Sequence, residues 1–166
     1  MRTMFHARRR WLPLAAMAAA IALLAPAGAL AAPGNDGTVK IDGVAFDDAP
    51  NNEPHVGCMF QVDFYGFDQG DFNAKVTFTA QPPTGKKVLL LTDTVFIGQD
   101  PAGGGTDLDA SATYDLSSTL QPFMIHPEQG YHVKLKVNAP GSIGKDTKYK
   151  TFWVVGCGGY PDPYGG

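Results

Sequence analysis

Arginine is missing from this chain after residue 10. All four arginines lie in the first ten residues, so the rest of the chain has nine lysines against sixteen Asp and Glu, a net charge of −7. An acidic chain without arginine is poorly suited to bind nucleic acid or an anionic membrane surface. We therefore expect neither as a partner.

Residues 1–31 have the composition of an export signal. The basic start is followed by the apolar stretch WLPLAAMAAAIALLAPAG, and Ala29, Leu30 and Ala31 supply the small residues that a signal peptidase recognises. The apolar stretch is interrupted by proline and is short for a membrane span. We expect cleavage after Ala31 and a secreted, extracellular protein with no membrane insertion, exported by the general secretory or the twin-arginine route.

Helical periodicity is nearly absent. Short segments in which apolar and polar residues alternate recur instead between Gly, Pro, Asn and Asp, which is typical of antiparallel sandwiches. This alternation predicts seven strands, at residues 38–46, 58–67, 73–81, 87–98, 111–120, 131–137 and 148–157. It predicts one all-β domain over residues 32–157. The Gly- and Pro-rich residues 158–166 are expected to form a disordered tail.

Cysteine is scarce, with two residues in the whole chain. An even count in an exported protein predicts one disulfide, between Cys58 and Cys157. Cys58 opens the second predicted strand and Cys157 closes the seventh. If the seven strands alternate in direction, both cysteines lie at the same end of the sandwich, which makes the bond possible.

Residues 119–139, TLQPFMIHPEQGYHVKLKVNA, resemble the end of the fifth strand and the whole sixth strand of a fibronectin type III or immunoglobulin-like domain. Leu120, Pro122, Tyr131, Val133 and Leu135 match a Leu-x-Pro element followed by a Tyr-x-Val-x-Val run. The resemblance implies a seven-stranded antiparallel immunoglobulin-like sandwich but no function. The mature chain, with its NNEPHVGC…VDFYGFD segment, also resembles an uncharacterised family of exported actinobacterial proteins.

Metal-ligand residues occur in the loops at both ends of the predicted sandwich. His55, His126 and His132 lie near the disulfide end and could serve zinc or copper, but no His-x-His or His-x₃-His spacing is present, and solvated loop histidines are the simpler interpretation.

The turns at the opposite end contain Asp68, Asp71, Asp107 and Asp109. Their oxygens suit calcium, although no segment matches an EF-hand loop and such aspartates are common in turns. These four are the candidate calcium ligands, and calcium is the one cofactor considered.

Motifs for catalysis are missing. PGSIG, residues 140–144, is not the Gly-x-Ser-x-Gly nucleophile elbow, and the AGGGT segment precedes no helix that could bind phosphate. We therefore expect no enzyme and no catalytic residue.

The last predicted hairpin carries a lysine stripe. Keeping its apolar residues inward sets Lys136 near Lys148 and Lys134 near Lys150, and like charges directly opposite are destabilising. Either acids on a neighbouring strand, such as Asp63, neutralise the stripe, or it receives an anionic partner. The candidate partner-binding residues are Lys134, Lys136, Lys148, Lys150 and Phe152.

We therefore expect a secreted, non-catalytic binding or structural module that acts on an extracellular protein or a cell-wall glycan. One alternative is a calcium-stabilised carbohydrate-binding module, which needs exposed aromatics such as Tyr65, Phe67 or Tyr114 on a flat face. A small secreted hydrolase is the third hypothesis and needs a cleft lined with histidine or paired carboxylates.

Overall fold

Strands dominate the structure, a computed structural model that describes residues 37–47, 49–99, 101, 103–140 and 145–157. The elements are β1 (Thr38–Gly43), β2 (His55–Val56), β3 (Met59–Tyr65), β4 (Asn73–Ala80), β5 (Val88–Phe96), β6 (Leu108–Asp115), α1 (Ser117–Leu120), β7 (Tyr131–Asn138) and β8 (Thr147–Val154). The expected signal segment, residues 1–31, and the expected tail, residues 158–166, lie outside the described residues.

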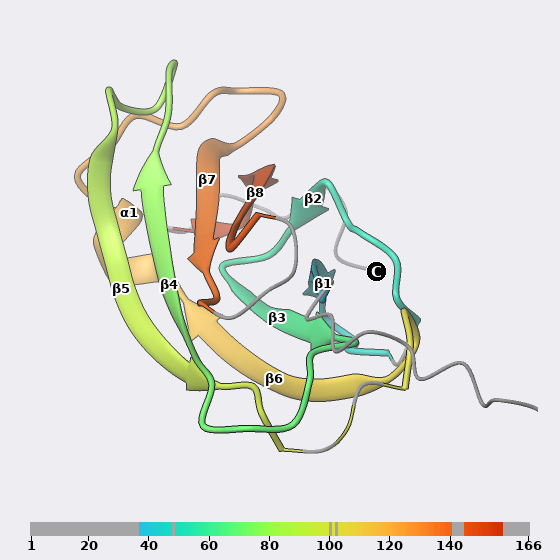
Figure 1. The fold of residues 1–166 in the computed structure, drawn as a ribbon. Coiled ribbons are helices and arrows are strands. Elements are labelled where there is room, and N and C mark those ends of the chain that lie inside the picture. The colour runs from blue at the N-terminus through green and yellow to red at the C-terminus, as the bar shows by residue number, and fades with distance from the viewer. Residues whose placement is uncertain (1–36, 48, 100, 102, 141–144, 158–166) are drawn as a thin grey trace, which may run out of the picture. The chain divides into compact units, whose positions relative to one another are not determined.

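The strands form two sheets (Figure 1). One has the order β1-β3-β6 and the other the order β2-β8-β7-β4-β5. Every pairing is antiparallel except that of β2 with β8. The prediction of an all-β sandwich is confirmed at this level, and each of the seven predicted strands corresponds to a long strand of the structure.

The core lies between the two sheets and is rich in aromatic rings. Phe60 of β3 lies 5.5 Å from Phe78 of β4 and 5.2 Å from Phe152 of β8, measured between ring centroids. Tyr114 of β6 lies 4.8 Å from Phe78. These edge-to-face contacts join the two sheets, because the four rings come from both of them.

The predicted strand over residues 111–120 is wrong at its C-terminal end. β6 ends at Asp115, and Ser117–Leu120 form the one-turn helix α1. Asp115 accepts hydrogen bonds from the backbone amide and the hydroxyl of Ser117, which lower its pKa and favour the turn. Leu116 and Leu120 are fully buried at a helical spacing of four.

The two-residue strand β2 was not predicted. The sequence assigned His55 and Val56 to a loop, but they pair in parallel with Trp153 and Val154 of β8. Two residues are too few to show an alternating pattern, so the pairing could not be found from periodicity. Among the described residues, no helix has the length and apolar character needed to cross a membrane.

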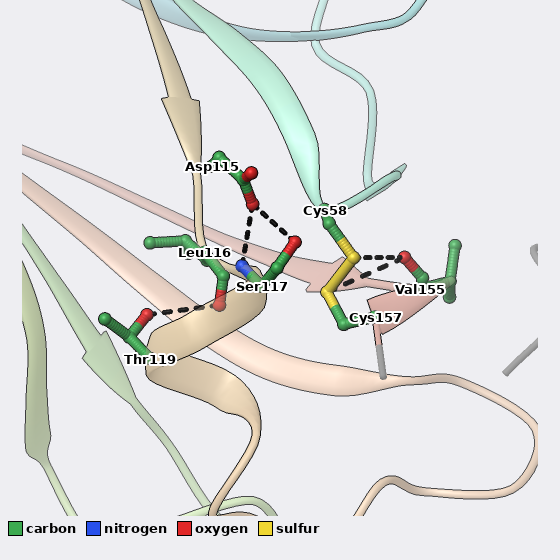
Figure 2. Close-up of a disulfide and its surroundings, with 7 residues drawn as sticks. All are labelled: Cys58, Asp115, Leu116, Ser117, Thr119, Val155 and Cys157. Carbon is green, nitrogen blue, oxygen red and sulfur yellow. Dashed lines mark hydrogen bonds between the residues drawn. A yellow bond between two sulfur atoms is a disulfide. The ribbon is translucent and has the colours of Figure 1, made fainter. Parts of the chain in front are cut away.

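The predicted disulfide between Cys58 and Cys157 is confirmed, with a Cα–Cα distance of 5.4 Å. Figure 2 shows it just before β3 and just after β8, so it joins the two sheets at one end. Both sulfur atoms lie beside the carbonyl oxygen of Val155. The backbone amide of Leu116 donates to the carbonyl of Cys58, which ties the start of α1 to the same end.

Candidate functional site

The predicted pairing of Lys136 with Lys148 and of Lys134 with Lys150 is wrong. Lys136 lies opposite Tyr149 in the structure, so β8 is shifted by one residue from the predicted register. A shift of one residue turns a strand over, because successive side chains point to opposite faces. Lys148 and Lys150 therefore point to the inner side of β8, and Tyr149 points outward.

The aromatic ring at position 152 decides which side of β8 faces the core. Phe152 is 1% exposed, so it is not available to a partner in the folded domain. Lys148 and Lys150 share its side of the strand. The Nζ of Lys148 lies 5.9 Å from the ring centroid of Phe67, and burial, with Lys40 adding repulsion, lowers the pKa of Lys150. Long aliphatic stems let lysines occupy such half-buried positions.

The outward sides of β4, β7 and β8 form a basic surface, which we call the lysine face. It consists of Lys75, Thr77, Thr79, Lys134, Lys136 and Tyr149. Thr77 lies opposite Lys136, and Thr79 lies opposite Lys134. Tyr149 is 54% exposed, and the Nζ of Lys134 lies 4.4 Å from its ring centroid, a cation–π contact. Lys134 and Lys136 therefore do share one surface.

The outward positions of β4, β5, β7 and β8, strands that the structure describes completely, carry no acid. Their one acidic residue is Asp93, which pairs with the buried Val76 on the inner side of the sheet. Its carboxylate accepts a hydrogen bond from the Tyr114 hydroxyl. Burial, together with the charge of Asp93, raises the pKa of Tyr114 and keeps this donor protonated. The lysine face thus has no carboxylate of its own sheet beside it.

A shallow hollow of about 170 Å³ opens on the lysine face. Its lining residues are Thr77, Thr79, Gln81, Lys87, Lys134, Lys136 and Tyr149. Most of the exposed lining is apolar surface. Its polar groups are hydroxyls, an amide and ammonium groups, and it includes neither histidine nor carboxylate. The lysine ammonium groups and the hydroxyl of Thr77 can donate hydrogen bonds to one anion, whereas Thr79 and the Gln81 amide already donate within the protein. These groups do not form an acid–base pair for hydrolysis.

Three histidines surround Trp153 beside the lysine face. The ring of His132 stacks on Trp153 with centroids 4.3 Å apart, and His126 lies at 6.0 Å. His55 is opposite Trp153 in the β2–β8 pair. The histidines expected at the disulfide end therefore meet around an aromatic ring. Within the described residues, no group of three His, Cys, Asp or Glu could hold a metal ion.

The candidate calcium ligands include two carboxylates that bind backbone amides. Asp109 is buried and accepts a hydrogen bond of 2.8 Å from the amide of Phe67. Asp107 accepts one of 2.6 Å from an amide of its own loop. Asp68 is half-buried, and Asp71 is exposed. These contacts give two of the four aspartates a role in holding the loops, and no three of the four, all of them residues that the structure describes, form a group that could hold a metal ion.

Asp63 lies in the other sheet, so it cannot neutralise Lys134 or Lys136 as the sequence suggested. Its Oδ1 accepts hydrogen bonds from Ser111 and Gln61, at 2.7 and 2.9 Å, and the residue is 1% exposed. The position on β3 that alternation placed on a solvent-facing side is therefore buried.

Asp42, on β1 of the same sheet, is also buried, and its Oδ2 accepts a hydrogen bond from the amide of Asp47. Burial raises its pKa above the ordinary 3.8, and the neighbouring acids Asp63, Asp47 and Glu53 add to the shift. The folded chain thus holds the Asp42 proton more tightly than the unfolded chain does.

Replacing Asp42 with asparagine should stabilise the protein at pH 7. Below pH 3.8 the Asp42 carboxyl is protonated in both the folded and the unfolded chain. Above its raised folded-state pKa the folded chain carries a buried charge. The stability of the wild type therefore falls as the pH rises from 3.8 through the folded-state pKa. The asparagine side chain stays neutral and can still accept a hydrogen bond from the amide of Asp47. Melting curves should give Asp42→Asn a higher melting temperature than wild type at pH 7. The difference in melting temperature should be smaller near pH 3.5. A variant that melts below wild type at pH 7 contradicts the prediction, and exposed Asp71→Asn is the control.

The aromatic residues named for a carbohydrate-binding face are buried. Tyr65, Phe67 and Tyr114 are 1%, 0% and 5% exposed. The aromatics on the outer side of the larger sheet are instead Phe96, Tyr149 and Trp153. The missed signal was cross-strand pairing. Tyr149 lies opposite Lys136 and Trp153 lies opposite His132, and a lysine or histidine opposite an aromatic suits an outward face.

The sequence also missed Lys75, Lys87 and the threonines, since each becomes part of the site only through the register of three strands. Comparison of the chain with protein-family models gives no match, and comparison with curated proteins gives none either.

Proposed function

We propose that this protein is a secreted, non-catalytic binding module of the immunoglobulin-like class, and that the lysine face binds an acidic extracellular partner. The observation that carries the proposal is the charge of this face. Lys75, Lys134 and Lys136 lie together on one side of a sheet without an outward acid, in a chain whose mature part has a net charge of −7. Such a local reversal of sign attracts an anionic partner.

The strand order supports the immunoglobulin-like assignment. The first, second and fifth long strands form one sheet, and the third, sixth and seventh lie together in the other, as strands A, B, E and C, F, G do in immunoglobulin domains. Tyr131, which the resemblance placed at the start of the sixth strand, opens β7 and is 3% exposed.

The open, acid-free lining of the hollow supports binding rather than hydrolysis. A hydrolase needs a histidine or a pair of carboxylates near the reacting bond, and the hollow is lined by neither. Secretion and the relation to exported actinobacterial proteins are parts of the same proposal and follow from the signal-like residues 1–31 and the NNEPHVGC…VDFYGFD segment.

Retention on a sulfonate resin tests the lysine face. We expect residues 32–166 to be retained at low salt and pH 7.5 despite their net negative charge, and to elute as the Debye length falls to about 8 Å near 0.15 M salt. Lys136→Glu should elute earlier, because Lys136 is exposed in the middle of the face. Lys145→Glu changes the net charge equally but lies outside the face, and it should elute with wild type. Equal elution of both variants would contradict the proposal.

A further inference from the structure

We propose that the partner of the lysine face is a polysaccharide with one carboxylate on each repeating unit, such as a uronic acid polymer, and that one carboxylate binds in the hollow beside Tyr149. This inference rests on the proposed function, because it names the class of ligand for the same surface. It is argued from the spacing of the charges, the size of the hollow and the residue types that surround it.

The lysines form a row of single charges rather than one cluster. Lys134 and Lys136 are two residues apart on the same side of β7, which separates their Cα atoms by about 6.6 Å. Lys75 of β4 lies opposite Asn138, which is two residues beyond Lys136 on the same side of β7. Lys87 lines the hollow. Charges spread in this way match a linear polymer with singly charged units better than one multiply charged group.

Repulsion between Lys134 and Lys136 favours an anion between them. The two ammonium groups have the same sign and no acid at the outward positions of their sheet. The ring of Tyr149 offsets part of the charge of Lys134 but leaves that of Lys136, which is exposed. A bound carboxylate would remove this repulsion and accept hydrogen bonds from both side chains.

The hollow has room for one ligand group. Its volume is about 170 Å³. That is below the usual range of closed small-molecule pockets, which is about 300–1,000 Å³. The rest of a larger ligand therefore has to lie along the open face, as an extended chain can.

The residue types favour a polysaccharide over a protein. The centres of protein–protein interfaces are enriched in Arg, Met and aromatic residues and depleted in Lys. The centre of this face has lysines and threonines, with Thr77 and Thr79 opposite the two lysines and the amide of Gln81 at the same hollow. The lysines suit the carboxylates of such a ligand. Thr79 donates to the carbonyl of Lys134, and the Gln81 amide donates to Thr79 and Ala80, so these two side chains offer their oxygens as acceptors for ligand hydroxyls.

Calorimetric titration of residues 32–166 with three probes tests the inference. The probes are an oligogalacturonate, a poly-glutamate peptide with the same number of carboxylates, and a neutral oligosaccharide of the same length. We expect the oligogalacturonate to bind about tenfold more tightly than poly-glutamate, and the neutral sugar not to bind measurably. Lys136→Glu should weaken oligogalacturonate binding about tenfold or more, whereas Lys145→Glu should leave it unchanged.

Each other outcome overturns a different claim. If poly-glutamate binds as tightly as oligogalacturonate, and Lys136→Glu weakens both, the face is an acidic-protein site: the polysaccharide inference fails and the proposed function stands. If the neutral sugar binds equally, the charge argument fails. If no probe binds and the resin does not distinguish Lys136→Glu from Lys145→Glu, the proposed function fails as well.

Discussion

Replacing Cys58 and Cys157 together with alanine should lower the free energy of unfolding by about 2–5 kcal/mol. The bond closes a loop between residues 99 positions apart, and the chain-entropy model gives about 4.7 kcal/mol for a loop of about 100 residues. The loss arises mainly in the unfolded chain, which gains conformations once the loop is open. Guanidinium unfolding followed by tryptophan fluorescence measures it, since Trp153 is the one tryptophan of residues 32–166.

The reduced wild-type protein is the control for this variant. It lacks the bond but keeps both side chains, so its unfolding curve should match that of the double alanine variant if loop closure is the main effect. Cys157 is 1% exposed, and a variant much less stable than the reduced protein would assign the loss to packing around that residue. Equal stability of the variant and the oxidised wild type would show that the bond does not stabilise the fold.

Phe60→Ala should cost about 3–5 kcal/mol, the range for removing a fully buried phenylalanine ring. Phe60 has no exposed surface and contacts the rings of Phe78, Tyr114 and Phe152. Its removal leaves a cavity between the sheets, where rigid strands on both sides limit collapse. The guanidinium unfolding assay described above measures the change.

Phe96→Ala is the matched control for this variant. Phe96 is 48% exposed at the end of the edge strand β5, so the same truncation should change the unfolding free energy by about 0.5 kcal/mol or little more. If the two variants lose similar stability, the aromatic cluster is not the centre of the core.

The alternation of apolar and polar residues predicted the sandwich well, because most strands have one clearly apolar side. In β7 the inward residues Val133, Leu135 and Val137 are fully buried, and His132 and Lys136 are not. Such a strand can face only one way without placing charge in the core. The same patterning in β3 and β4 located the strands that hold the centre of the domain.

Alternation failed in β8 because both sides of this strand carry apolar residues. Tyr149 and Trp153 occupy one side, and Phe152 and Val154 occupy the other. The position of Phe152 within the aromatic cluster decides between them, and that contact requires residues from the other sheet. Since the candidate site lies on the outer side of β8 and its neighbours, this one strand limited what could be predicted about it.

The disulfide also determines how the domain carries mechanical load. A force applied to the two ends of the chain passes from Cys58 through the sulfur–sulfur bond to Cys157 and bypasses the chain between them. That bypassed loop contains β3 to β8 and therefore the whole lysine face. Only segments outside the loop can be pulled straight while the bond is intact. Before Cys58, the segment from residue 37 to residue 57 includes β1 and β2 and spans at most about 75 Å when extended. The lysine face is thus kept out of the path of tension.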